Sequence, residues 1–309
     1  MVLHPALIAS IFGGLVGSFL NVVIYRLPNG ESIVTPRSRC PKCLTPIPGW
    51  LNIPVLSWVL LRGKCYTCKN PIPARYPMVE LLTALLWAAV VTRFGLTWAS
   101  LAGCIFASAL VAITFIDIDH WEIPDEISLP GIVLGLIARP LVFDVPWYDG
   151  VLGAVAGALL LACVRWFFTW WKGIEAMGLG DLKLIAMTAA LLGLGSILPT
   201  LVVGSFAGSI IGGVALLVQR FRKKDAEPEP VPEPVPEPLT GPEAPADEED
   251  DWVPPPTAIP FGPFLALGAL AHLLMAPALE RLLVVFGEFM APLLQPIAQL
   301  LARLLAGGE

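Results

Sequence analysis

Charged residues are scarce in this sequence. Asp, Glu, Lys and Arg make up only 14% of the 309 residues, whereas hydrophobic residues make up 56%. Ordinary soluble domains carry about 25% charged residues. Because the mean hydropathy is also high, at +0.75, the composition excludes a soluble globule, a disordered tail and a nucleic-acid-binding protein. It is typical of a polytopic membrane protein.

Basic residues are absent from one acidic segment, residues 225–256, which holds eleven acids. The rest of the chain keeps 19 basic residues against 14 acidic ones, so this segment is the reason that the net charge of the whole chain is -6. Pro and Glu alternate along its first half. Such a composition cannot bury a core, so we predict an extended, solvated cytoplasmic linker.

Uncharged runs predict about eight transmembrane helices in an all-α fold. The run Leu184–Gln219 has 36 residues, which would make one helix of about 54 Å. The hydrocarbon core of a bilayer is only about 30 Å thick, so we predict two helices that meet near Leu194–Pro199. The other runs are Ala6–Tyr25, Met78–Thr92 (with Glu80 near its start), Phe94–Ile116, Ile127–Phe143, Gly150–Trp171 and Thr257–Leu279.

Basic residues indicate the orientation of these helices. They gather in the loop 26–75, in the segment Arg220–Lys224 and in the loop that contains Lys172 and Lys183. Eight spans put all three on one side, which the positive-inside rule makes cytoplasmic. The chain then divides as follows: first transmembrane helix 1–25, cytoplasmic four-cysteine loop domain 26–77, six-helix membrane core 78–224, linker 225–256, eighth transmembrane helix 257–285, and amphipathic tail 286–309.

Four cysteines form two C-x-x-C pairs in the first cytoplasmic loop, Cys40 with Cys43 and Cys65 with Cys68. This spacing lets four thiolates bind one tetrahedral ion, so we predict a structural Zn²⁺ site. Reduced, metal-free cysteines or disulfides are the alternatives. The apolar insert Gly49–Leu61, between the two pairs, is expected to dip into the membrane interface.

Two carboxylates lie at the cytoplasmic ends of predicted spans. Asp117 follows the run Phe94–Ile116, and Asp181 lies in Gly178-Leu-Gly-Asp181 at the start of another span. If they meet, they share one proton, as aspartic peptidases require. One carboxylate would then activate a water molecule, and the protonated one would polarise the scissile carbonyl.

Structural roles remain open for these acids. Asp181 is placed to cap a helix in the headgroup region, and Asp125, after Pro124, is a natural cap for the span that follows. Asp119 and its acidic neighbours suit a solvated loop. Spacing alone does not choose among Asp117, Asp119 and Asp125. The small residues of Gly13–Ser18 predict close helix packing in the first span.

Several motifs together resemble the type IV prepilin peptidases. The residues that carry the resemblance are Gly17–Pro28 (GSFLNVVIYRLP), the paired C-x-x-C loop, Asn52–Trp58 (NIPVLSW), Leu61–Cys65 (LRGKC), Arg75–Glu80 (RYPMVE), Phe115–His120 (FIDIDH), Pro124-Asp125, Gly178–Lys183 (GLGDLK) and Ile259–Gly268 (IPFGPFLALG). They cover nearly the whole chain in order. Only the Pro/Glu linker and the extended tail depart from the pattern.

The resemblance implies a bifunctional GxGD membrane aspartyl peptidase. Such enzymes cut the leader from type IV prepilins and type II secretion pseudopilins, then N-methylate the new N-terminus with S-adenosylmethionine. It implies Asp117 and Asp181 as the catalytic pair, Cys40, Cys43, Cys65 and Cys68 as zinc ligands, and a bacterial inner-membrane location. Prepilins, the lipid bilayer and pilus or secretion assembly components are the implied partners. For the methyl donor, it points only to the first cytoplasmic loop and Glu80.

Two other functions fit parts of the sequence. A proton-coupled transporter would place its acids near the midplane, on broken helices in corresponding halves of the chain. Here both acids lie at one mouth, and no inverted repeat is visible. A zinc-loop membrane scaffold would need neither aspartate. Substitution of the two aspartates distinguishes all three functions.

Overall fold

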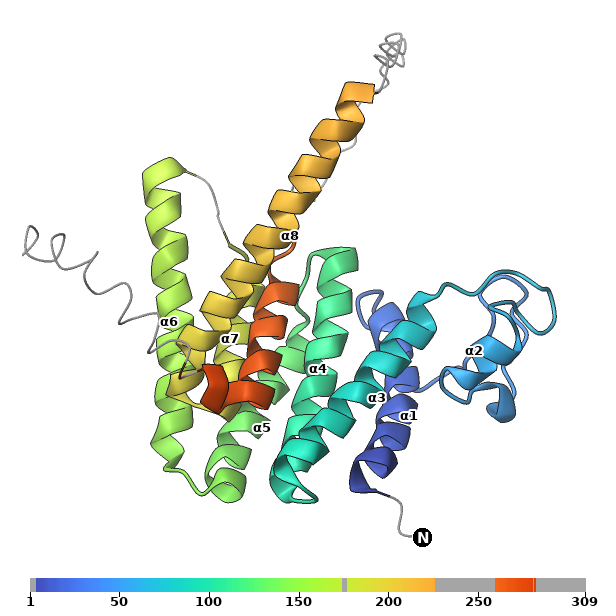
Figure 1. The fold of residues 1–309 in the computed structure, drawn as a ribbon, viewed down its shortest axis with the longest axis horizontal. Coiled ribbons are helices and arrows are strands. Elements are labelled where there is room, and N and C mark those ends of the chain that lie inside the picture. Colours follow the sequence, from blue (N-terminus) through green and yellow to red (C-terminus); the bar gives the residue numbers. More distant parts are fainter. Residues whose placement is uncertain (1–3, 174–176, 226–258, 280, 282–309) are drawn as a thin grey trace, which may run out of the picture.

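The computed structural model describes residues 4–173, 177–225, 259–279 and 281, and the secondary structure there is helical apart from two isolated bridges, Arg39 with Pro46 and Lys64 with Pro71. This confirms the all-α prediction. The elements are α1 Pro5–Arg26, η1 Gly49–Leu51, α2 Leu56–Leu60, α3 Arg75–Phe94, α4 Trp98–His120, α5 Asp125–Phe143, α6 Trp147–Lys172, α7 Leu179–Leu192, η2 Leu194–Ser196 and α8 Ile197–Asp225, followed by the helix Gly262–Leu279, which is orange-red in Figure 1.

Seven of the described helices are long and apolar enough to cross a membrane. The remaining predicted helix, the first half of the run Leu184–Gln219, exists as α7. Its 14 residues measure only about 21 Å, so it does not span a bilayer by itself. The predicted break is confirmed, because α7 ends at Leu192 and α8 starts at Ile197. The last helix starts at Gly262 rather than at the predicted Thr257.

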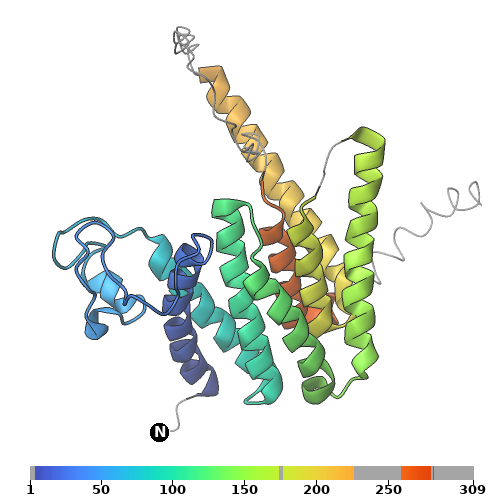
Figure 2. The same ribbon diagram turned by 180° about the vertical axis from the view of Figure 1, so that it is seen from behind.

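Successive membrane helices run up and down, so one end of the bundle collects four loops (Figures 1 and 2). At this end α1, α4, α6 and α8 finish, and α3, α5, α7 and the last helix begin. Helix α4 supplies much of the core, since 67% of its most apolar stretch is buried. Helix α1 packs on α3, while α7 packs on α5 and α6. The predicted six-part division of the chain stays a prediction, and the linker and the tail lie almost entirely outside the described residues.

Close packing between α1 and α3 follows from the small residues of α1. A Cβ atom on Gly17 would lie 2.7 Å from the Cα atom of Glu80, and one on Gly13 would lie 2.8 Å from the Trp87 side chain. Real Cβ atoms do not approach other atoms so closely, so the two helices meet at backbone distance only because these residues are glycines. The predicted packing role of Gly13–Ser18 is confirmed.

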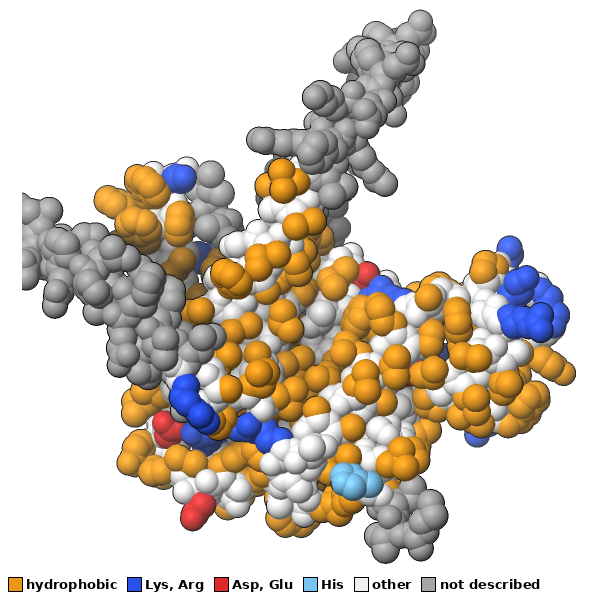
Figure 3. All heavy atoms as spheres, in the orientation of Figure 1, with side chains coloured by type: hydrophobic (Ala, Val, Ile, Leu, Met, Phe, Trp, Pro, Cys, Tyr) orange, Lys and Arg blue, Asp and Glu red, His pale blue; other side chains and the backbone are white. Residues whose placement is uncertain are grey.

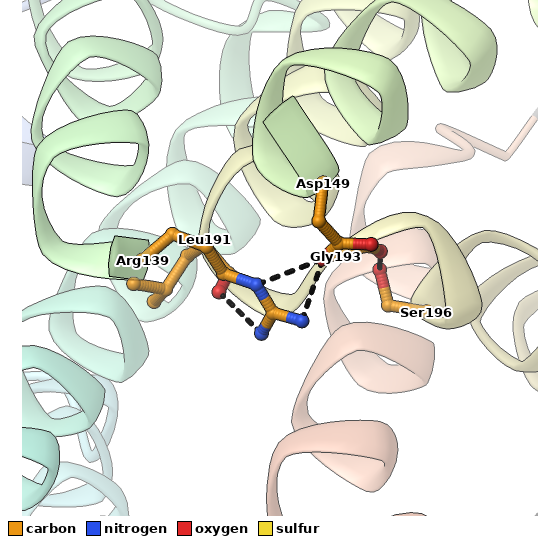
Figure 4. Close-up of polar contacts among 5 residues, drawn as sticks. All are labelled: Arg139, Asp149, Leu191, Gly193 and Ser196. Carbon is orange, nitrogen blue, oxygen red and sulfur yellow. Dashed lines mark hydrogen bonds and ion pairs between the residues drawn. The ribbon is translucent and has the colours of Figure 1, made fainter. Parts of the chain in front are cut away.

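The opposite end of the bundle holds a polar cluster between α5, α6 and the turn after α7 (Figure 4). The Arg139 guanidinium donates to Asp149 Oδ2 at 2.7 and 3.0 Å and to the Leu191 carbonyl at 3.2 Å. Gly193, with a φ of 86°, leaves room for this pair, since a Cβ atom there would overlap both charged groups. We call Arg139, Asp149, Leu191 and Gly193 the arginine clamp. It fixes the depth at which the short α7 ends.

Candidate active site

Asp117 lies in the last turn of α4 and is only 6% exposed. A capping box at Thr97 and Ser100 starts this helix, and Trp121 ends it in the left-handed conformation. The carboxylate oxygen Oδ2 is buried and has no hydrogen-bond partner among the described residues. A buried polar atom left without a partner is costly, and it commonly marks a functional group.

Asp181 is the third residue of α7 and is 8% exposed. The residue at the N-cap position is Gly178, in the extended conformation, and no side chain caps this helix. Asp181 is therefore a buried carboxylate at a helix start, and the alternative of a cap exposed to headgroups is wrong. A carboxylate in the first turn is favoured by the helix dipole, which helps the protein to keep it there.

The two aspartates share one site at the end of the bundle where four loops collect. The Asp117 carboxylate is close enough to exert a Coulombic effect on Asp181. Ile123 joins their surroundings: a Cβ atom on Gly180 would lie 2.8 Å from Ile123, and one on Gly262 would lie 3.3 Å from it. A Cβ atom on Gly262 would also overlap the Asp117 carboxylate. Three helices thus converge on the pair.

Gly262 is the site residue that sequence reasoning missed. It begins the last helix, and its motif Ile259–Gly268 contributed to the family resemblance without receiving a role. A glycine between two Pro-Phe dipeptides was the available signal. It did not reveal that the glycine backbone would lie against Asp117, more than one hundred residues earlier in the chain.

Two of the neighbouring acids, Asp119 and Asp125, are engaged in ion pairs. Asp119 lies within α4 and pairs with Arg75 of α3, which also donates to the Phe115 carbonyl. The predicted capping role of Asp125 is wrong, because the N-cap of α5 is Pro124 and Asp125 is the first helical residue, paired instead with Lys183. Burial therefore distinguishes Asp117 from these two acids, which spacing could not do.

The four cysteines converge in the loop domain, and their sulfur atoms all lie within 4.8 Å of one another. Cys40 Sγ lies 3.8 Å from Cys68 Sγ, and Cys43 Sγ lies 4.0 Å from Cys65 Sγ. Four thiolates bound to zinc at about 2.3 Å would have tetrahedral edges of about 3.8 Å. None of the four is in a disulfide. The residues therefore fit a tetrahedral Zn²⁺ site.

Both cysteine pairs have the same local geometry. The Cys40 N–H donates to the Thr45 carbonyl and the Cys65 N–H to the Asn70 carbonyl, and each second cysteine is followed by a residue with positive φ, Leu44 or Lys69. Hydrogen bonds from Thr45 lower the pKa of Cys43 to about 6. These hydrogen bonds favour the thiolate form of Cys43, which is the form that binds a metal ion.

A cavity of about 170 Å³ adjoins the cysteines. Its walls are mostly apolar and include Pro48, Leu51, Ile72 and Tyr76, and no acidic side chain lines it. It therefore offers no carboxylate for the ammonium group or ribose of a methyl donor. Glu80, the other residue considered for the donor, accepts a hydrogen bond from the Val55 N–H at 2.6 Å.

Fold and site together define a multi-pass membrane protein that presents two buried aspartates at one end and a four-cysteine cluster in a loop domain. The bacterial peptidase A24 N-terminal domain family matches residues 11–94, and the type IV leader peptidase family matches residues 104–213. The first match covers the four cysteines and the second covers both aspartates. No solved structure gives a significant match.

Curated relatives match over most of the chain. A protein of Myxococcus xanthus is 39% identical over 88% of this chain and 91% of its own length. One of Pseudomonas aeruginosa is 36% identical over 93% and 97%, and one of Neisseria gonorrhoeae is 43% identical over 70% and 82%. All three are named prepilin leader peptidase/N-methyltransferase. The chain belongs to the type IV leader peptidase family.

Proposed function

We propose that this protein is a bifunctional membrane enzyme that cleaves the leader peptide of type IV prepilins or type II secretion pseudopilins and N-methylates the new N-terminal residue. Family membership over most of the chain supports both activities. The observation that carries the peptidase reaction is the pair of buried carboxylates, Asp117 and Asp181, supplied by different helices at one end of the bundle.

In the proposed reaction, one aspartate of the pair is ionised and takes a proton from a water molecule. The other is protonated and donates a hydrogen bond to the carbonyl oxygen of the scissile peptide bond. Water attacks the carbonyl carbon, and the proton taken up is passed to the leaving amine nitrogen. Asp117 Oδ2, which has no partner among the described residues, is free to bind the water or the carbonyl.

The site lies on the side where the basic loops gather, which the positive-inside rule makes cytoplasmic. The proposed location is therefore the bacterial inner membrane. A prepilin would then lie with its apolar stem in the bilayer and its leader in the cytoplasm, so that the scissile bond reaches the ends of α4 and α7. The new amino terminus would appear near the four-cysteine domain for methylation, with S-adenosylmethionine as the methyl donor.

The sharpest test is substitution of each aspartate by asparagine, which keeps the shape but removes the ionisable group. Asp117→Asn and Asp181→Asn should each lower the rate of leader removal by about 10²–10⁴-fold or more, because general acid–base catalysis is lost. The readout is the mass of a co-expressed pilin. Mass spectrometry reports leader loss and methylation on the same molecule.

The matched control is Asp119→Asn. It removes a carboxylate from the same helix turn, but one that is exposed and paired with Arg75. It should keep cleavage within the same order of magnitude. Processing at the wild-type rate by either buried variant, with normal amounts of protein in the membrane, would refute the aspartyl mechanism and favour a scaffold or a transporter.

The metal assignment has its own test. Cys68→Ser should abolish stoichiometric zinc binding in the purified protein, whereas substitution of Cys104, a buried cysteine of α4, by Ser should leave zinc content unchanged. Elemental analysis measures this directly, without reference to activity. Zinc retained at one ion per chain in Cys68→Ser would contradict a four-thiolate site.

A further inference from the structure

The segment between the two cysteine pairs has the chemistry of a membrane element although it belongs to a loop domain. Residues 49–61 contain no charged side chain and form the short helices η1 and α2. Charged residues resume at once with Arg62 and Lys64, next to Gly63, where the chain turns back. We call residues 49–61 the apolar insert.

The insert lies deep along α1 rather than beyond its end. A Cβ atom on Gly14 would lie 3.4 Å from Pro54, which shows that the two residues are neighbours. Gly14 lies twelve residues before Arg26, so Pro54 lies about 18 Å below the end of α1. Half of a hydrocarbon core is about 15 Å. Both ribbon views show α2 beside α1, level with its body (Figures 1 and 2).

Irregular backbone survives at this depth only when its polar groups are satisfied within the protein. The N–H groups of Leu51, Asn52, Leu56, Ser57, Val59 and Leu61 donate to backbone carbonyls of the insert or of Pro48. The Ile53 N–H donates to the Ser57 hydroxyl, and the Val55 N–H donates to Glu80 Oε2. Pro54 has no N–H. The Trp58 indole donates to the Ile72 carbonyl.

Outward-facing side chains of the insert are large and apolar. Their exposed fractions run from 48% to 70%, for Trp50, Ile53, Leu56, Val59 and Leu60. On α1 beside them, Leu15 and Phe19 are about half exposed as well, at 50% and 49%. Pro54 lies against α1 at Gly14, and the exposed apolar side chains of α1 face lipid because α1 is a membrane span. Figure 3 shows hydrophobic side chains over this part of the molecule, with Lys and Arg at its margin.

We propose that the apolar insert is a re-entrant membrane element, whose exposed side chains contact lipid acyl chains and whose deepest turn is held by Glu80. The four-cysteine domain is thereby anchored in the bilayer, in addition to its two covalent connections to α1 and α3. Bases at its margin, among them Arg62 and Lys64, face the headgroups. This assignment does not depend on the peptidase or methyltransferase reaction.

Glu80 holds the insert through one hydrogen bond at an unusual backbone position. Val55 has a φ of 61°, in the left-handed region that β-branched residues rarely adopt, and such a conformation persists only when its surroundings fix it. The 2.6 Å hydrogen bond from its N–H to Glu80 is one such restraint. Glu80 is therefore a positioning residue for the loop domain.

Lipid contact is measured by photo-crosslinking of the full chain in nanodiscs. Benzoylphenylalanine placed at Leu60, which is 70% exposed, should give severalfold more adducts with lipid acyl chains than the same group at Leu44, which is 59% exposed in the first cysteine pair. Intact-mass analysis identifies the adducts. Equal lipid labelling at the two positions would overturn the proposal, as would adducts at position 60 mainly with a second copy of the chain or another protein.

The role of Glu80 is tested in the same assay. Glu80→Ala removes the acceptor and should lower the lipid adducts at position 60 to the level found at position 44. Glu80→Gln keeps a carbonyl oxygen for the Val55 N–H and should restore them. Zinc content shows whether the domain remains folded in each variant. Unchanged adducts in a folded Glu80→Ala protein would refute the positioning role.

Discussion

The ionisable side chains at the two ends of the membrane bundle differ in the partners that they have. At one end, Arg139 and Asp149 of the arginine clamp neutralise each other, and a further guanidinium N–H donates to the Leu191 carbonyl. At the other end, the carboxyl groups of Asp117 and Asp181 are buried near each other, and Asp117 Oδ2 has no partner among the described residues. The opposite charges of the clamp compensate each other, whereas two neighbouring carboxyl groups cannot both ionise easily.

This difference indicates a structural role for the arginine clamp and a chemical role for the two aspartates. Arg139 and Asp149 bind each other and the end of α7, so the clamp is best explained as a joint that sets the position of α7. An unpartnered acid has unused hydrogen-bonding capacity and gains from binding water or a peptide. Because α7 carries Asp181 near its start and ends at the clamp, the joint also fixes the depth of one of the two aspartates that we propose to be catalytic.

Among the changes that test this comparison, the largest effect is expected from crowding the Asp117 carboxylate. Gly262→Ala adds a Cβ atom that would overlap the Asp117 carboxylate. Since a displacement of about 1 Å can cost about 10²-fold in rate, we expect leader removal to fall by that order while the protein remains in the membrane. The rate is measured on purified enzyme with a prepilin substrate.

The matched control for this change is Gly213→Ala in α8, where a Cβ atom would meet no other atom within 4 Å. It should keep full activity. Equal rates in the two glycine variants would show that the backbone at 262 does not bear on Asp117. The last helix would then be removed from the active site.

Much of the fold and of the candidate site could be predicted from the sequence. Uncharged runs predicted the helices, and the 36-residue run Leu184–Gln219 predicted the break, because helix length and bilayer thickness are fixed quantities. The cysteine spacing predicted the cluster. Spacing also predicted that Asp117 and Asp181 lie at the same end of the bundle.

Sequence failed where the outcome depends on contacts between distant segments. Pattern alone could not tell the buried Asp117 from Asp119, since their difference is a partner on α3, Arg75. The pattern predicted Asp125 as a helix cap, although its carboxylate forms an ion pair with Lys183, which is distant in the sequence. The role of Gly262 was invisible for the same reason: close approach to Asp117 is a property of tertiary packing, not of local composition.

A moderate effect is expected from breaking the satisfied end. Arg139→Ala leaves Asp149 without its ion-pair partner and the Leu191 carbonyl without a donor, and hydrogen bonds to charged groups are worth about 1.5–3 kcal/mol. We expect a lower midpoint of thermal unfolding in detergent. At temperatures where the variant is folded, leader removal should persist, though at a reduced rate, because the aspartates themselves are intact.

Arg93→Ala provides the comparison for this change. Arg93 lies at the same end, is exposed and donates to the Leu274 carbonyl, so its loss should lower the unfolding midpoint less. An unchanged midpoint in Arg139→Ala would show that the clamp does not stabilise the fold. The structural role that we assign to this end of the bundle would then be wrong.

The smallest effect is expected from breaking the Asp125–Lys183 ion pair, which lies at the same end of the bundle as Asp117 and Asp181. Its side chains are 51% and 34% exposed, and exposed pairs contribute about 0–1 kcal/mol. Lys183→Met and Asp125→Asn should therefore each change stability only slightly and leader removal by a few-fold, and the double variant should add little because both remove the same interaction. Thermal unfolding and cleavage rates of the three variants measure this. If Lys183→Met abolished cleavage while Asp125→Asn did not, Lys183 would act on the substrate or on Asp181 directly. An ion-pair partner would then no longer indicate that a charged residue is structural rather than catalytic.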